Sequence, residues 1–368
     1  MNEARNLARS SFALLSGRLG STLVNIGFTV YFAHRLTKIQ FATLAVFEIL
    51  TALTNMISNF GLETYCLREI PALIMNEDFS KASAFIKTAI TNRLIWSTGI
   101  GITLILFSYN ISGIFFKDVS YVNIIRIISI GVVFFSMNTS MGLIASSLKY
   151  FREIAIINFI ITVTFCISSV ILYYFIGFEG WVIGFSLSRG VGCILYLFLL
   201  KRWLFTHGEF YPWTKMVRKS FPYYIRGFVK FGLLRLDQIV IGVFMTPGAL
   251  STYYVAKRFS FYVNVLIESM GRPLLIRISE VKRHGKEQIQ KMLTQISRYN
   301  SFIFLPICLG IAAYGFPLLE IYGGEKYTDG FMVLVVLCLA RILKGLMHSV
   351  YENGLFVHGE PKEALIVD

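Results

Sequence analysis

The stretch covering residues 222–246 is apolar and long enough to cross a bilayer, yet it carries four charged side chains. On a helix, Arg226, Lys230 and Asp237 fall within about 40° of one another. Arg235 points roughly the opposite way. A charge near the centre of a bilayer costs about 2.5–3.5 kcal/mol on insertion scales. This segment is therefore expected to line a protein-walled cavity or to be neutralised by buried partners.

The same imbalance of charge extends over the other apolar runs of the chain. Their clearly intramembrane acids are Glu48, Asp237 and Glu268, too few to neutralise the cations around them. Structural pairing is one interpretation, with Asp237 and Glu48 as counter-ions. A cavity lining is the other, with these two acids as candidates for binding a coupling cation. The deeper cations that would line the cavity are Arg18, Arg189, Lys230, Arg235, Lys257, Arg258, Arg341 and Lys344.

Three further arginines lie close to the ends of apolar runs. Long side chains at such positions can extend to the membrane surface, so we expect Arg93, Arg126 and Arg226 to do so. A cationic cavity shielded from water attracts anions. One guanidinium group can bind two phosphate oxygens through two parallel hydrogen bonds, and a lysine ammonium supplies a single point charge. The predicted cargo is therefore negatively charged.

Enzymatic and metal-binding motifs are missing from the sequence. It has no HExxH, DxD, GxSxG, Walker A or GxGxxG pattern. Its five cysteines form no CxxC pair. We therefore predict no catalytic residues, no metal and no cofactor.

The elements that would position the charged groups are membrane-spanning helices. Of the 368 residues, 55% are hydrophobic, and the mean hydropathy is +0.63. Backbone groups in lipid must be satisfied within a helix, so the fold class is predicted as an all-α polytopic membrane protein with about ten transmembrane helices. The predicted spans are 11–34, 41–62, 87–109, 121–147, 153–176, 180–200, 223–246, 249–272, 299–322 and 329–356.

The distribution of loop lysines and arginines predicts the orientation. With a cytoplasmic N-terminus, only Arg35, Lys38, Lys117 and Lys326 lie outside, which satisfies the positive-inside rule. This also accounts for the net charge of +14 without a nucleic-acid partner. The stretches 68–87 and 278–298 are predicted to follow the membrane surface, the second as an amphipathic helix.

The chain is predicted to form two lobes. Residues 1–200 would be an N-terminal lobe of six helices, 201–222 a basic cytoplasmic linker, and 223–368 a C-terminal lobe of four helices. A faint repeat sets TKIQFATLAVFE against TPGALSTYYVAK. Residues 142–155 likewise resemble 354–364. This alignment predicts that the second lobe lacks its last two helices.

Several stretches together resemble a known family. They are ARSSFALLSGRLGSTLVNIGFTVYFAHRL, FATLAVF, NFGLETYCLREIP and RLDQIVIGVFMTPGALSTYYVAKR. They are similar to the bacterial Wzx-like O-antigen and capsule flippases of the multidrug/oligosaccharidyl-lipid/polysaccharide (MOP) superfamily.

The resemblance implies a function as well as a fold. Such proteins have two lobes of six helices and move undecaprenyl-diphosphate-linked oligosaccharide across the bacterial inner membrane by alternating access. Arg18, Lys257 and Arg258 match positions where relatives carry cavity charges. Membrane lipids, a polysaccharide polymerase and other assembly proteins would be partners. The present sequence departs from the pattern because its predicted helices stop at ten.

Two alternatives to a lipid-linked oligosaccharide flippase remain. A multidrug exporter of the same superfamily usually handles organic cations and would need an acidic cavity. A membrane glycosyltransferase or ligase would need catalytic groups on a large external loop, and the predicted external loops are short. The sign of the charge favours the flippase.

Overall fold

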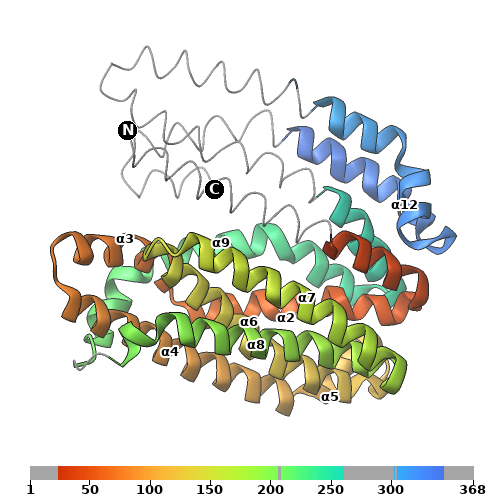
Figure 1. The fold of residues 1–368 in the computed structure, drawn as a ribbon. Coiled ribbons are helices and arrows are strands. Elements are labelled where there is room, and N and C mark those ends of the chain that lie inside the picture. Colours follow the sequence, from red (N-terminus) through yellow and green to blue (C-terminus); the bar gives the residue numbers. More distant parts are fainter. Residues whose placement is uncertain (1–23, 206–208, 261–301, 303–304, 344–368) are drawn as a thin grey trace. The chain divides into compact units, whose positions relative to one another are not determined.

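The computed structural model describes residues 24–205, 209–260, 302 and 305–343. Within these ranges the chain is helical and contains no strand, which confirms the predicted all-α class (Figure 1). Several predictions fall outside them. These are the amphipathic helix 278–298, the repeat at 354–364, and the residues Arg18, Glu268 and Lys344.

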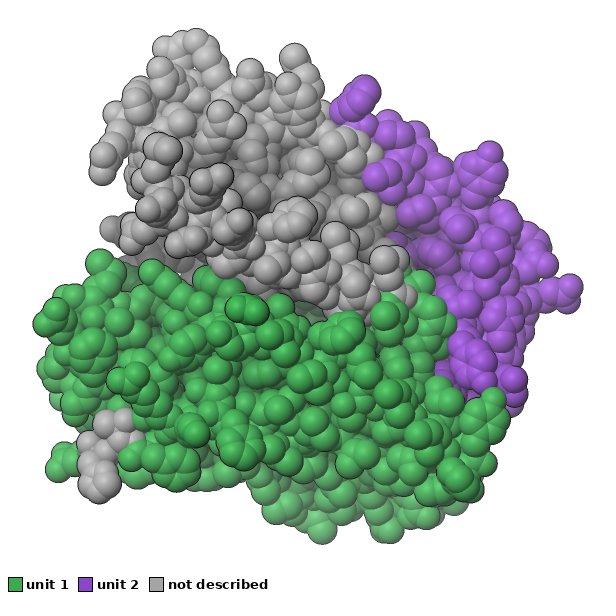
Figure 2. Space-filling model, viewed as in Figure 1, with its two compact units in different colours: residues 1–29, 39–247 green, residues 30–38, 248–368 purple. Residues whose placement is uncertain are grey.

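The chain divides into two compact units, coloured separately in Figure 2. Unit 1 comprises residues 1–29 and 39–247, and unit 2 comprises residues 30–38 and 248–368. The helix that follows the predicted linker therefore belongs to unit 1 by its contacts. The predicted lobe boundary at 201–222 differs from this division and stays a prediction.

Unit 1 contains most of the long helices. They are α2 (Lys38–Asn59, its first residue in unit 2), α3 (Leu62–Met75), α4 (Phe79–Leu106), α5 (Ser108–Phe116), η1 (Val119–Tyr121), α6 (Val122–Ser147), α7 (Phe151–Ile176), α8 (Phe178–Leu204) and α9 (Trp213–Phe244). Neighbours α4 and α6, α6 and α8, and α7 and α8 run side by side (Figure 1). Small residues bring α7 and α8 together, since a Cβ on Gly184 would lie 2.6 Å from the Ser169 backbone.

Five helices in the described ranges are long and apolar enough to cross a membrane, namely α2, α4, η1 with α6, α7 and α8. A sixth span would be the pair Leu305–Ala313 and Gly315–Gly323, which is bent by 71°. The predicted span 299–322 was expected to be one unbroken helix, and the bend at Tyr314 corrects this. The other predicted spans beyond 246 extend outside the described residues.

The stretch 68–87 is helical over most of its length, and its predicted course along the membrane surface stays a prediction. Most of it belongs to α3 and to the first turns of α4, so residues 76–78 alone join two helices. Tyr65, Cys66 and Ile70 of α3 are buried in the core of unit 1. Ile70, within the stretch, and Tyr65 and Cys66, just before it, form an apolar face of α3 that packs inward beside the charged residues.

Unit 2 contains helical residues 247–260 (the first lying in unit 1), α12 (Gly315–Gly323), η3 (Glu325–Gly330) and helical residues 331–343. Residues 30–38 of the N-terminal region pack with them. The His34 ring donates from Nε2 to the Ile321 carbonyl oxygen at 3.0 Å. Lys326 donates to the Leu36 carbonyl oxygen at 2.6 Å. Together with the Lys38–Asp329 ion pair of 2.9 Å, these contacts fix residues 30–38 to residues 321–329.

Candidate functional site

The charged segment 222–246 lies almost entirely on α9, a helix of 32 residues that ends at Phe244. The helix begins about three turns before the predicted span, so the second half of the predicted linker is helical. Only residues 205–212 separate α8 from α9. The polar N-terminal half and the apolar C-terminal half of α9 therefore belong to one continuous helix, with Pro222 inside it.

The N-terminal half of α9 packs closely on the corner between α2 and α3. Gly61 occupies that corner with a φ of 72°, and a Cβ there would lie 2.3 Å from the Ser220 carbonyl oxygen and 2.6 Å from the Tyr224 nitrogen. The Ser220 hydroxyl donates to the Phe60 carbonyl oxygen at 2.7 Å. Met216 is fully buried in the same contact. These contacts cover the face of α9 that carries Met216 and Ser220.

Lys230 lies on the open face and is exposed, and Arg226 is partly exposed on the same stripe. Asp237 continues this stripe, and its carboxylate accepts a hydrogen bond from the Gln238 nitrogen at 2.7 Å. The helical stripe predicted from the spacing is therefore present on α9. Its role in binding stays a prediction.

Arg235 points away from this stripe, as its helical angle predicts. It donates to a Glu48 carboxylate oxygen on α2 at 2.7 Å and to the Gln238 side-chain oxygen at 2.8 Å. About a quarter of each charged side chain remains exposed, 26% for Arg235 and 29% for Glu48. For these two residues the structure shows the pairing that the sequence left open as an alternative.

Arg189 lies on α8 between two aromatic rings. Its guanidinium carbon is 5.1 Å from the centre of the Phe135 ring and 4.9 Å from that of Phe185. Among the described residues, its Nε atom is buried without a hydrogen-bond partner. Aromatic faces attract a cation without neutralising its charge, so Arg189 keeps its positive field inside unit 1.

The remaining predicted site residues within the described ranges belong to unit 2. Lys257 lies 5.7 Å from the Tyr253 ring centre, and Arg258 lies 5.1 Å from that of Tyr254. Arg341 donates from Nε to the Ser260 hydroxyl at 2.9 Å. The predicted cations are thus divided between the two units, and a single cavity lined by all of them stays a prediction.

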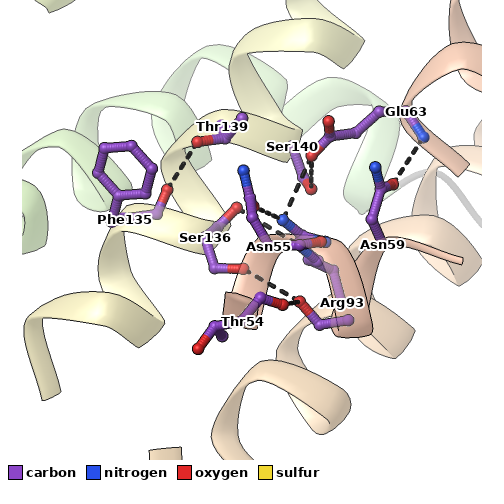
Figure 3. A network of polar contacts seen from close by, with 10 residues as sticks. Thr54, Asn55, Asn59, Glu63, Arg93, Phe135, Ser136, Thr139 and Ser140 are labelled. Carbon is purple, nitrogen blue, oxygen red and sulfur yellow. Dashed lines mark hydrogen bonds and ion pairs between the residues drawn. The ribbon is translucent and has the colours of Figure 1, made fainter. Parts of the chain in front are cut away.

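A buried polar network in unit 1 was missed by the sequence analysis (Figure 3). At its centre, Arg93 of α4 pairs with Glu63 of α3 at 3.2 Å. The guanidinium also donates to the side-chain and carbonyl oxygens of Asn55 on α2. Its Nε donates to the Ser136 carbonyl oxygen on α6 at 3.4 Å. One arginine thereby connects four helices.

The Glu63 side of this network is closer to solvent. Its carboxylate accepts from the Ser140 hydroxyl at 3.5 Å, and its nitrogen donates to the Asn59 side chain at 3.0 Å. These groups line a small crevice that also contains Cys66. The Glu63 side chain is 17% exposed and that of Arg93 only 2%.

The prediction that Arg93 extends to the membrane surface is therefore wrong. Its predicted position near the end of a span came from placing the start of that helix at residue 87 instead of Phe79. Glu63 was not considered as its partner, and it lies on the short helix α3, which is not among the described helices long and apolar enough to cross a membrane. The error for Arg93 is therefore an error of helix boundary. By contrast, Arg126 is exposed on α6.

Within the described ranges, no group of three or more His, Cys, Asp or Glu side chains is arranged to hold a metal ion. The cysteines there are Cys66, Cys166, Cys193, Cys308 and Cys338, and all are free thiols.

Comparisons with known proteins give a consistent result. The family described as polysaccharide biosynthesis proteins matches residues 32–331. A probable low-salt glycan biosynthesis flippase, Agl15 of Haloferax volcanii, is 22% identical over 365 residues, which cover 97% of this chain and 73% of that protein.

Solved structures with the same fold belong to multidrug transporters of the MATE family in the MOP superfamily. An outward-facing structure matches with a TM-score of 0.67 and 14% identity, over 98% of this chain and 83% of that chain. An inward-facing structure matches with a TM-score of 0.66 and 13% identity, over 95% and 88% respectively. At such identities the match establishes the MOP fold, as the sequence resemblance predicted.

Proposed function

We propose, since the chain belongs to the family of polysaccharide biosynthesis proteins, that this multi-pass membrane protein is a flippase for lipid-linked glycan precursors. Its cargo would be an oligosaccharide attached through a diphosphate to a polyprenol, which in a bacterial inner membrane is undecaprenol. The family and its flippase relative support transport in preference to glycosyl transfer.

The observation that carries the choice of an anionic cargo is the exposed position of Lys230 on α9. This lysine lies inside an apolar segment, where an uncompensated charge is costly. Arg226 lies on the same stripe, and Arg235, on the opposite side of the helix, is paired with Glu48. A diphosphate supplies the negative charge that such a face favours.

The proposed mechanism is alternating access with the diphosphate at the cations. Lys230 and Arg189 in unit 1, and Lys257, Arg258 and Arg341 in unit 2, would bind it together with Arg18 and Lys344. Binding of the anion would reduce repulsion among these cations and so shift the equilibrium toward a closed state. Asp237 remains the candidate for binding a coupling cation, while the pairing of Glu48 supports a structural role for that residue.

The alternative of a multidrug exporter rests on the fold neighbours alone. Exporters of organic cations would need acidic groups at the binding face, and α9 has Asp237 as its only acid. A transport assay with an organic cation and with a lipid-linked oligosaccharide separates the two functions directly. We expect transport of the second alone.

The decisive experiment compares Lys230→Gln with the conservative Lys230→Arg in proteoliposomes that contain a lipid-linked oligosaccharide. Loss of one charge-assisted contact should reduce transport by about tenfold in the first variant. The second should keep most of it. Because Lys230 is exposed, both variants should unfold at the wild-type temperature. Undiminished transport by a folded Lys230→Gln protein would eliminate the cargo role.

A cytoplasmic N-terminus is part of the proposal and has its own test. Lys117 and Lys149 are exposed turn residues in unit 1 with φ values of 56° and 63°. The charge distribution predicts that Lys117 lies outside and Lys149 inside. In a background without the native cysteines, an impermeant thiol reagent added to intact cells should label Lys117→Cys and spare Lys149→Cys. The reverse labelling pattern would contradict the predicted cytoplasmic N-terminus.

A further inference from the structure

Two arginines of unit 1 lie inside the helix bundle in opposite chemical surroundings. Arg93 is paired with Glu63 and donates to oxygens of Asn55 and Ser136. Among the residues that the structure describes, the Arg189 side chain has neither an ion pair nor a hydrogen bond. Two aromatic rings lie beside its guanidinium instead. Unit 1 therefore contains one arginine whose charge is compensated and one whose charge is not.

The two rings at Arg189 come from different helices. Phe185 precedes Arg189 by four residues on α8, and residues so spaced are neighbours on any helix, as Tyr254 and Arg258 in unit 2 also show. Phe135 belongs to α6, so its ring reaches Arg189 only through the packing of α6 on α8. The first ring thus follows from local geometry, whereas the second requires tertiary structure.

The contact between α6 and α8 is close near Arg189. The Asn138 side chain on α6 donates to the Arg189 carbonyl oxygen at 2.6 Å. A Cβ on Gly131 of α6, or on Gly192 of α8, would lie 2.5 Å from a side-chain oxygen of the other helix. Larger residues at these two positions would separate the helices. The packing of the two helices therefore fixes how far the Phe135 ring is from Arg189.

An aromatic ring and an acid hold a guanidinium in different ways. A ring attracts the cation through its face and leaves the N–H donors unused. A carboxylate accepts from two of these donors and removes the net charge. The Arg189 Nε is enclosed without a partner, whereas its terminal nitrogens are not among the enclosed atoms, and the residue is partly exposed. Arg189 therefore presents its full charge and unused donors to accessible space.

Folding alone gives no reason for this arrangement. An unpaired charge inside a helix bundle loses hydration without compensation. The same bundle supplies Arg93 with an acid, and α6 contributes the Ser136 carbonyl oxygen to that arginine. Figure 3 shows the ring of the preceding residue, Phe135, directed away from this network. The missing partner of Arg189 is therefore expected to be a ligand.

We propose that Phe135 and Phe185 are positioning residues that hold Arg189 by its faces and keep its N–H groups available for a phosphate group of the cargo. A guanidinium can donate two parallel hydrogen bonds to phosphate oxygens. The phosphate then brings the negative charge that the described side chains do not bring. This inference rests on the proposed function and adds two positioning residues to it. An anionic phospholipid offers the same phosphate chemistry, so the experiment compares both ligands.

The test uses Phe135 because its ring, among the described residues, has an aromatic or cationic contact with Arg189 alone. Phe185 also contacts two phenylalanine rings. The variants are Phe135→Leu and Phe135→Tyr, and the matched control is Phe134→Leu at the adjacent position of α6. Phe134 is 37% exposed, and its ring has no aromatic or cationic neighbour in the described ranges. Binding of undecaprenyl diphosphate, undecaprenol and phosphatidylglycerol is measured with full-length protein in zwitterionic nanodiscs.

Phe135→Leu should weaken binding of undecaprenyl diphosphate about fivefold, which corresponds to one lost cation–ring contact. Phe135→Tyr keeps the ring face, so this variant and Phe134→Leu should both stay within about twofold of wild type. Arg189→Gln should weaken binding about tenfold or more. It removes no ion pair or hydrogen bond of the described structure, so it should unfold at the wild-type temperature. In this background, Phe135→Leu should have no further effect, because the ring acts through the arginine.

Each competing explanation gives a different result. An equal loss from Phe135→Leu in both backgrounds would assign the ring to packing and overturn its positioning role. Undiminished binding by folded Arg189→Gln protein would overturn the phosphate contact. An equal loss of phosphatidylglycerol binding would assign the site to a phospholipid and overturn the assignment to the cargo. Wild-type protein that does not prefer undecaprenyl diphosphate over undecaprenol would instead overturn the proposed function.

Discussion

Replacing Glu63 with glutamine should destabilise unit 1 strongly without changing its shape. The substitution removes the charge that compensates Arg93, whose side chain is only 2% exposed. Breaking a buried ion pair from one side costs about 3–5 kcal/mol. Asn55 and Ser136 still offer oxygens to the guanidinium, so we expect a cost near the lower limit, about 3 kcal/mol.

Arg93→Gln should lower the free energy of unfolding less at low pH than at neutral pH, because the Glu63 carboxyl left without its partner can bind a proton. Burial raises the pKa of the Glu63 carboxyl, and Arg93 acts in the opposite direction. Without Arg93 the pKa of the folded state should rise further above that of the unfolded state. The stability of this variant is then greatest below the ordinary carboxyl pKa and falls as the pH increases through the raised value.

The measurement is a double-mutant cycle by reversible unfolding in mixed micelles, followed by tryptophan fluorescence. The double variant Glu63→Gln/Arg93→Gln should be more stable than the sum of the single losses predicts, by about 2 kcal/mol. Single losses below about 1 kcal/mol that add in the double variant would show that the pair contributes little. The reasoning from burial would then be refuted.

Two further predictions concern packing and pairing. Gly61→Ala should destabilise the protein by about 1–3 kcal/mol, because its φ of 72° is strained for alanine and its Cβ would meet backbone atoms of α9. Gly113→Ala, with nothing within 4 Å of the added Cβ, should leave the unfolding free energy unchanged or raise it by up to about 1 kcal/mol, because alanine favours the helix α5 more than glycine does. A loss equal to that of Gly61→Ala would contradict the packing argument. Glu48→Gln/Arg235→Gln should keep transport, since Arg235 is paired rather than free for cargo, and should cost about 1 kcal/mol or less at this exposure. Loss of transport by a stable double variant would contradict this and show that Arg235 contributes to binding the cargo.

Apolar length alone sufficed to predict the central helices. The predicted span 121–147 differs by one residue from α6, and 153–176 differs by two from α7. Lipid-facing helices need a continuous apolar run, and that requirement is directly visible in the sequence.

Polar helix ends were not predictable in the same way. Lys215 and Lys219 lower the hydropathy of the first turns of α9, and a low hydropathy predicts a linker there. Met216 and Ser220, four residues apart and both buried, were the available signal of a helical face. The Glu63–Arg93 pair joins two helices, and hydropathy contains no information about which helices meet.

The packing of residues 30–38 into unit 2 has a consequence for biosynthesis. His34 contacts the carbonyl of a residue 287 positions later, and Lys38 pairs with one 291 positions later. A ribosome adds roughly 5–20 residues per second, so the early segment waits about 15–60 s for its partners to be made. During that interval the early helices are already inserted while the groups that His34 and Lys38 will bind do not yet exist. The contacts of residues 30–38 in unit 2 can therefore form only after residues 321–329 have been made, so this segment has to stay accessible until then.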